Sequence, residues 1–176
     1  MICNKIIDNN HLFVKGNKYI VDTNVLISLY GNKKYNLQID ENKKLKKATQ
    51  YYNNAISQKC TIYVPAIVLS EFVNLYFRER WSELRASNPT KYTDEKKHYR
   101  NTEKYAKDCE YIKKVIEEEI MKVAKPINDD FDKLSIENMF KFDDDDFNDR
   151  LIIHIANKND LYVISADADI RKMKIR

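Results

Sequence analysis

The stretch "KYIVDTNVLISLYGN" (residues 18–32) decides the expected fold, because its apolar run stops abruptly at a carboxylate. Residues 18–22 are short, β-branched and closed by a polar break, which is typical of a buried strand. A short helix is expected next, over residues 25–30. A buried charge is costly unless something pairs with it. Asp22 therefore needs a partner group, or a position that water and ligands reach.

Strand-like and helix-like patterns alternate along the rest of the chain. Apolar runs at residues 60–64 and 161–164 predict two more strands. Helical periodicity predicts helices over 41–58, 65–80, 93–125 and 145–158, with Pro126 ending the third of these. Residues 127–142 have no clear assignment. This alternation indicates an α/β layer structure with a mostly parallel sheet, and the length of 176 residues suits a single domain, 1–176.

Charge and glycine content narrow the function classes. The net charge is +4, but residues 1–125 carry 23 Lys and Arg against 15 Asp and Glu, whereas residues 126–176 carry 8 against 12. A basic body is compatible with nucleic acid, but charge alone favours a solvated lysine-rich surface. The two glycines, Gly16 and Gly31, lie in no glycine-rich phosphate-binding motif. The sequence therefore argues against a P-loop or dinucleotide-binding function.

Cysteine usage and hydropathy indicate the compartment. The three cysteines are odd in number and widely spaced, which is typical of reduced thiols in a cytoplasmic protein. No apolar run approaches the length of a membrane span, and no signal peptide opens the chain.

Acidic residues recur where the predicted strands end. Asp22 and Asp167 each follow an apolar strand, and Glu71 lies about two turns into the helix after the second strand. Asp146 and Asp149 are three residues apart and share one helix face. The carboxyl ends of parallel strands meet at one edge of a sheet, where open α/β folds bind ligands. These acids are expected to converge there.

Converging carboxylates repel one another, and a divalent cation would offset that repulsion. Hard oxygen ligands suit Mg²⁺ or Mn²⁺ better than zinc, and such ions assist the hydrolysis of phosphodiesters. Each acid also has a simpler explanation. Asp22, Asp167 and Asp169 could cap helices, and residues 143–145 could be a solvated acidic run at a helix start. Glu71, within an apolar helix, fits such an explanation least well.

Four stretches carry a resemblance to a known family. "YIVDTNVLI" (19–27), "VPAIVLSEF" (64–72), "DFNDRLIIHIA" (146–156) and "LYVISADADI" (161–170) resemble the PIN-domain nucleases, and among them the VapC-type toxin ribonucleases. The resemblance implies a three-layer α/β/α fold with a central parallel sheet. It also implies a Mg²⁺- or Mn²⁺-dependent nuclease activity, usually on single-stranded RNA.

Residue by residue, the resemblance assigns four catalytic, metal-binding acids, namely Asp22, Glu71, Asp149 and Asp167. It adds Asp146 as a further metal ligand one turn before Asp149. Supporting roles fall to Ser165, at a position that orients ligands or water, and to Thr23 and Asp169.

Two departures from the family pattern stand out. Residues 78–125 form a longer helical insertion than compact toxins have. The final edge strand of the family is not evident, so the sheet is one strand short or this strand lies within 127–142. RNA is the expected substrate, and lysines and tyrosines in 32–47 and 91–105 could hold it or simply form solvated helix faces.

An antitoxin protein and a second copy of the chain are candidate partners by resemblance. The alternative function is a non-catalytic PIN-like module that binds RNA or protein through its insertion. An aspartyl-phosphate receiver ranks low, because the last strand is followed by "SAD" where such proteins need a lysine.

Overall fold

A four-stranded parallel sheet forms the centre of the molecule in the computed structural model, which describes residues 5–8, 10–31, 39–129, 131–139 and 146–172. The strand order is β3-β2-β1-β4, and every neighbouring pair is parallel. In the central strand β1, Tyr19 is aligned with Ile62 of β2 and Tyr162 of β4. The strands are β1 (Lys18–Val21), β2 (Thr61–Pro65), β3 (Ala124–Ile127) and β4 (Tyr162–Ile164).

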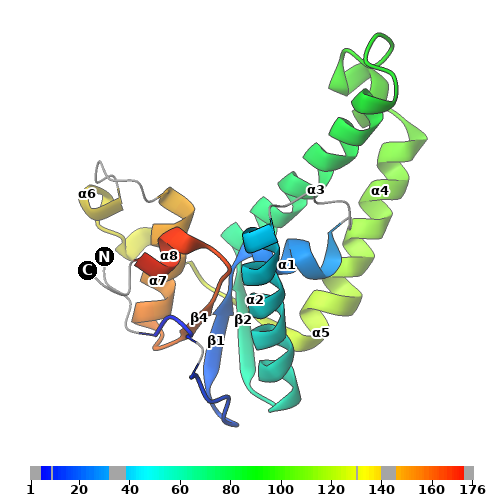
Figure 1. Cartoon of the computed structure of the whole chain (residues 1–176). Coiled ribbons are helices and arrows are strands. Elements are labelled where there is room, and N and C mark those ends of the chain that lie inside the picture. The colour runs from blue at the N-terminus through cyan, green and yellow to red at the C-terminus, as the bar shows by residue number, and fades with distance from the viewer. Residues whose placement is uncertain (1–4, 9, 32–38, 130, 140–145, 173–176) are drawn as a thin grey trace.

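Helices cover both faces of this sheet. Figure 1 shows α1 and α2 on one side of the strands and α7 and α8 on the other, which confirms the three-layer α/β/α arrangement. The helices are α1 (Thr23–Tyr30), α2 (Ile39–Ser57), α3 (Ala66–Ser87), α4 (Glu103–Lys114), α5 (Met121–Val123), α6 (Ile136–Met139), α7 (Phe147–Lys158) and α8 (Ala168–Lys172). Three tighter or wider turns complete them: the π-helical segments η1 (Lys96–Arg100) and η2 (Val115–Ile120), and the 3₁₀ turn η3 (Phe131–Lys133).

Burial in the core explains why residues 19–21 of β1 form an apolar run. Tyr19, Ile20 and Val21 have no exposed surface, because helices cover both faces of the strand. Helix α7 contributes Ile153 and Ile155, which are equally buried. The strand ends at Val21, and Asp22 follows it at the carboxyl edge of the sheet, still only 5% exposed.

The helix predicted over residues 93–125 is wrong in its extent. The chain forms η1 first and then breaks at Asn101, before Thr102 caps α4 by accepting a hydrogen bond from the Tyr105 amide. The helical run ends at Val123, and Pro126 lies in strand β3. Pro is tolerated on an edge strand, so it marks the sheet edge here.

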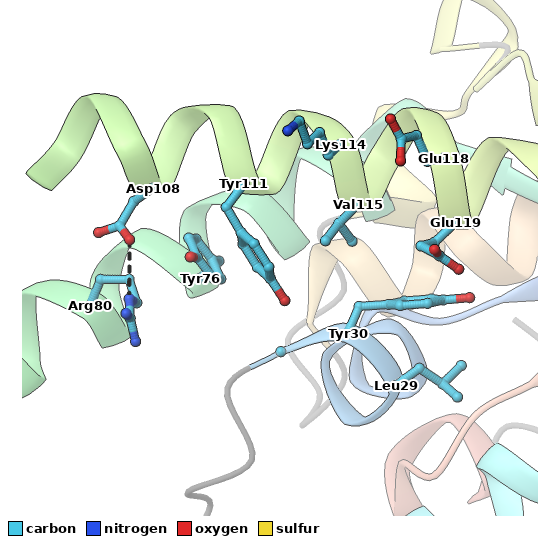
Figure 2. Close-up of a pocket in the computed structure, with 11 residues that line it drawn as sticks. Leu29, Tyr30, Tyr76, Arg80, Asp108, Tyr111, Lys114, Val115, Glu118 and Glu119 are labelled. Atoms are coloured by element: carbon cyan, nitrogen blue, oxygen red, sulfur yellow. Dashed lines mark ion pairs between the residues drawn. The ribbon is translucent and has the colours of Figure 1, made fainter.

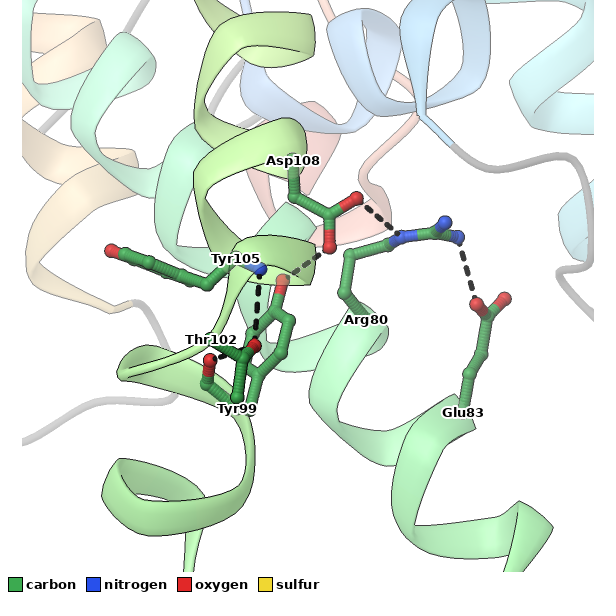
Figure 3. Close-up of polar contacts among 6 residues, drawn as sticks. All are labelled: Arg80, Glu83, Tyr99, Thr102, Tyr105 and Asp108. Atoms are coloured by element: carbon green, nitrogen blue, oxygen red, sulfur yellow. Dashed lines mark hydrogen bonds and ion pairs between the residues drawn. The ribbon is translucent and has the colours of Figure 1, made fainter.

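The helices α3 and α4 form a hairpin that extends beyond the sheet (Figure 1). A partly buried polar network ties its two arms together, as Figure 3 shows. The Tyr99 hydroxyl donates to Asp108 at 2.7 Å, and the other Asp108 oxygen lies 3.5 Å from Nε of Arg80. Arg80 also pairs with Glu83 at 2.8 Å. These contacts hold the hairpin in a fixed arrangement.

The N-terminal segment takes the sheet position beside β4. Ile6 bridges Val163 in parallel, and the Val163 amide donates to the carbonyl of Lys5 at 3.0 Å. Within 127–142, the described residues contribute only Ile127 to the sheet. The outer edge of β4, for which the sequence showed no further strand, is therefore covered by the N-terminal segment.

Membrane-spanning length and free thiols can be assessed for the described residues. None of their helices is both long and apolar enough to cross a lipid bilayer. Cys60 and Cys109 are free thiols, as expected, while the third cysteine, Cys3, lies outside the described residues.

Candidate active site

Asp22 lies at the carboxyl end of β1, where its amide still donates to the Ile164 carbonyl of β4 at 3.0 Å. Its side chain is 5% exposed. One carboxyl oxygen, Oδ2, accepts hydrogen bonds of 2.5 Å from both the Ser165 hydroxyl and the Asn24 amide. Although Asp22 occupies the cap position of α1, its side chain makes no capping hydrogen bond. The helix-cap explanation for this carboxylate is therefore wrong.

Glu71 lies in α3 and is half-buried. Its Oε2 accepts a 2.8 Å hydrogen bond from the hydroxyl of Thr23, which is 3% exposed. Thr23 follows Asp22 directly, so the first turn of α1 positions two carboxylates, one through the backbone and one through a hydroxyl. This contact joins α1 to α3 next to the sheet edge.

Asp146 and Asp149 enter from α7 on the opposite layer. Asp146 caps this helix, because its Oδ1 accepts from the Asp149 amide at 2.9 Å. Asp149 lies one turn inside the helix and is half-buried. Its carboxylate accepts no hydrogen bond from the described residues. The capping bond therefore fixes the Asp146 carboxylate, whereas no hydrogen bond from the described part of the chain fixes that of Asp149.

Ser165, Asp167 and Asp169 follow β4. The Ser165 hydroxyl accepts from the Asp167 amide at 2.9 Å while it donates to Asp22. Asp167 in turn accepts from the Asp169 amide at 2.7 Å, which confirms that it caps the start of α8. Asn24 also binds this loop, because its Oδ1 accepts a hydrogen bond from the Ala166 backbone amide at 3.1 Å.

One cavity of about 290 Å³ brings five of the predicted acids together. Carboxylates from β1, α3, α7 and the loop after β4 line it, although these residues are up to 145 positions apart in the sequence. Thr23 also lines this cavity, whereas Ser165 and Asp169 do not. The acids are Asp22, Glu71, Asp146, Asp149 and Asp167.

A comparison with family models identifies the fold. The family model described as PIN domain matches residues 19–175, which is most of the chain. The chain belongs to the PIN domain family. PIN domains are generally metal-dependent nucleases that act on RNA or DNA, so the fold is of a nuclease type. No curated protein and no solved structure matches the chain.

In this PIN domain, burial and the neighbouring acids together raise the pKa values of Asp22 and Asp149. Burial raises the pKa of Asp22 to about 6, and Asp167 and Glu71 add to this effect. Burial also raises the pKa of Asp149, to about 8, with further contributions from Asp146, Asp22 and Asp167. Asp149 is the more exposed of the two, but Asp22 has the Ser165 hydrogen bond to lower its pKa. The pKa of Asp149 therefore lies above neutral pH, and that of Asp22 lies below it.

The carboxylates of the cavity are suitable ligands for a divalent cation, but they are not close enough together to bind one. The described lining of the PIN-domain cavity includes five carboxylates and no Lys, Arg or His. Carboxylate oxygens are the ligands that Mg²⁺ and Mn²⁺ prefer. However, no three His, Cys, Asp or Glu side chains among the described residues are grouped so as to hold a metal ion. The cavity thus has the chemistry for a cation, but its ligands would have to move closer.

Sequence reasoning missed two polar residues of this site. Asn24 bonds both Asp22 and the loop after β4, and Asn148 lines the cavity between Asp146 and Asp149. The position of Asn24, two residues after Asp22, was the available signal. Asn at a helix start ordinarily indicates a cap, which hid its role.

Two sequence predictions fall wholly or partly outside the described residues. The acidic run at 143–145 is one of them, and the first part of the basic stretch 32–47 is the other. His154 lies partly buried in α7, in keeping with a packed helix residue.

Proposed function

We propose that this PIN domain is a metal-dependent endoribonuclease that hydrolyses phosphodiester bonds of single-stranded RNA. The observation that carries the proposal is the cavity in which five carboxylates from four parts of the fold meet without a lysine or arginine in its described lining. Structural acids rarely crowd in this way, because each raises the pKa of its neighbours at a cost in stability. A site that holds a cation gains from the same crowding.

The proposed ligands of Mg²⁺ or Mn²⁺ are Asp22, Glu71, Asp149 and Asp167, with Asp146 beside them. Such an ion supplies neutralisation of the phosphate charge and activation of a water for in-line attack. The chain itself orients the carboxylates. Hydrogen bonds hold one named oxygen in each of four of them: Oδ2 of Asp22, Oε2 of Glu71, and Oδ1 of Asp146 and of Asp167.

Further proposals rest on the motif resemblance rather than on the cavity. The enzyme is proposed to act in the cytoplasm as the toxin of a toxin–antitoxin pair, with an antitoxin protein and a second copy of the chain as partners. The position of this gene beside a small reading frame would support the pairing.

One observation favours the alternative, a non-catalytic PIN-like module that binds RNA or protein. No three described acids are grouped for a metal ion, which suits a domain that has lost the chemistry. The two functions differ in a simple assay.

The deciding experiment is cleavage of a pool of structured and unstructured RNAs with Mn²⁺, with Mg²⁺ and with EDTA. We expect the parent to cleave only with metal, and Asp22→Asn to be inactive. Glu117→Gln removes an exposed carboxylate of η2 and is the matched control, so it should cleave like the parent. Absence of cleavage by the pure parent in any divalent metal would favour the binding module, and an active Asp22→Asn protein would refute the assigned site.

A further inference from the structure

A second cavity, of about 440 Å³, adjoins the acidic one along helix α3. The two cavities share Glu71, Leu75 and Asn148 in their linings, so one opens beside the other. The second cavity is lined by the middle of α3, by Asn148 of α7 and by the region around η1. It therefore leads from the proposed cleavage site toward the α3–α4 hairpin.

The α3 wall of this second cavity is a single helix face. Glu71, Asn74, Leu75 and Arg78 are spaced at i, i+3, i+4 and i+7, which places them in one stripe. Arg78 lies seven residues beyond Glu71, or about 10 Å along the helix axis at about 1.5 Å per residue. A rigid helix thus sets the spacing between a proposed metal ligand and a guanidinium.

The charges in the second cavity are not equivalent. Arg100 is already paired, because its Nε lies 2.6 Å from Glu95. Arg78 is exposed and makes no hydrogen bond or ion pair with any described residue. The amides of Asn74 and Asn148 are likewise without a partner within the described part of the chain. The Arg78 guanidinium and these two amides, which have no acceptor among the described residues, therefore lie next to the cavity that the carboxylates line.

We propose that Arg78 binds a phosphate of the substrate strand that flanks the scissile phosphate, with the Asn74 amide beside it. The guanidinium suits this role, because its planar fork matches a phosphate and stays charged at all relevant pH values. Amide side chains commonly contact phosphate and sugar oxygens and so set the register of a strand. The direction of the strand, from the acidic cavity to Arg78, rests on the proposed nuclease function.

The test separates strand binding from catalysis. Binding of a short fluorescent single-stranded RNA is measured by anisotropy in EDTA, over a range of salt concentrations. Hydrolysis of bis(p-nitrophenyl) phosphate, a diester with no flanking phosphate, is measured with Mn²⁺. We expect Arg78→Ala to weaken RNA binding about tenfold, the value of one charge-assisted hydrogen bond, and to lower the salt slope by about 0.7. Its hydrolysis of the small diester should equal that of the parent.

Lys107→Ala is the matched control, because it removes an exposed cation of the same hairpin that pairs with no described residue and lines no part of this cavity. Equal RNA binding by Arg78→Ala and Lys107→Ala would overturn the proposal, even if the parent cleaves RNA. Arg78→Lys should keep the salt slope and lose part of the affinity, since it keeps the charge without the fork.

Glu95→Gln gives a test with the opposite sign. It removes a negative charge from the cavity and releases Arg100, so RNA binding should tighten; unchanged or weaker binding would count against a strand along this path. If the parent hydrolyses neither substrate but Arg78→Ala still binds RNA more weakly than Lys107→Ala, the phosphate site stands and the nuclease proposal fails.

Discussion

Ser165 donates a 2.5 Å hydrogen bond to Oδ2 of Asp22, although 143 residues separate the two in the sequence. The contact is buried and spans the carboxyl ends of the neighbouring strands β1 and β4. The same hydroxyl accepts from the Asp167 amide. One serine therefore fixes the orientation of a carboxylate before it and of a loop after it.

Replacing Ser165 by Ala should slow RNA cleavage while leaving the fold intact. Residues that orient metal ligands typically contribute about 10- to 100-fold to metal affinity or activity, so we expect a loss of this size in the Mn²⁺-dependent rate. The free energy of unfolding, measured by urea denaturation, should fall by about 2 kcal/mol, because the hydroxyl makes two hydrogen bonds of about 1 kcal/mol net each. Full activity of the variant would show that Asp22 needs no such support.

Thr23→Val should weaken metal binding through Glu71. Valine keeps the shape of threonine but cannot donate the 2.8 Å hydrogen bond to Oε2. We expect the Mn²⁺ affinity, measured by calorimetry, to fall about tenfold or more. Thr23→Ser retains the hydroxyl and is the control, which should bind Mn²⁺ nearly as the parent does. Equal loss in both variants would assign the effect to packing rather than to the hydrogen bond.

The metal-free protein should lose stability as the pH rises from about 4 to about 8. The pKa of Asp149 is raised to about 8 in the folded chain, against about 4 when unfolded, so the folded state holds the proton more tightly. Such a group contributes stability below pH 4 that is lost as the pH rises through the folded pKa. Thermal melts in EDTA at pH 5 and pH 8 measure this difference.

Asp149→Asn should reduce this pH dependence, because the amide carries no charge to repel Asp146 and Asp22. The variant should melt above the parent at pH 8 in EDTA and should be inactive with Mn²⁺. Glu110→Gln, at an exposed position of α4, should change neither property. A variant that melts below the parent at pH 8 would contradict the crowding of charges.

Asp108→Ala should destabilise the hairpin without affecting the chemistry. It removes the acceptor of the Tyr99 hydroxyl and the partner of Arg80 in a position that is 7% exposed. We expect a loss of about 2–4 kcal/mol in urea denaturation, the scale for breaking a buried charged network. Tyr99→Phe, which removes the hydroxyl alone, should lose less. Both variants should still hydrolyse bis(p-nitrophenyl) phosphate at a temperature where they are folded.

A cavity of about 740 Å³ lies between this hairpin and α1, and it is larger than both the acidic cavity and the one beside Arg78 (Figure 2). Its lining mixes tyrosines with both signs of charge, including the Arg80–Asp108 pair. Among the described residues, it shares no lining residue with the acidic cavity. Asp108→Ala therefore perturbs this cavity and not the proposed site.

The acids at the strand ends were predictable because their positions follow from chain periodicity. An apolar run buried on both faces must end at the sheet edge, so Asp22 and Asp167 were placed by the residues before them. The position of Glu71 near this edge was predicted in the same way, because Glu71 lies in the helix that follows β2. The hydrogen bonds among these residues were not predictable, since Ser165 meets Asp22 only once β4 is paired with β1.

Strand β3 could not be found from sequence for a different reason. Two of its four residues, Lys125 and Pro126, are exposed, and neither favours a strand. Its pairing with β2, with Tyr63 opposite Lys125, is set by the tertiary context of an edge position. The helical periodicity before it continued too far into the strand for a boundary to be visible.

The N-terminal segment beside β4 has a consequence for handling the protein. Ile6 and Ile7 are 5% and 7% exposed, and the pairing of Lys5 and Ile7 with Val163 satisfies the outer edge of the strand. A chain shortened by seven residues would present that edge, with its apolar flank, to other molecules. Open strand edges recruit further strands, so the shortened protein should self-associate and precipitate. An inactive shortened protein would then report aggregation rather than a change in the carboxylates that follow β4.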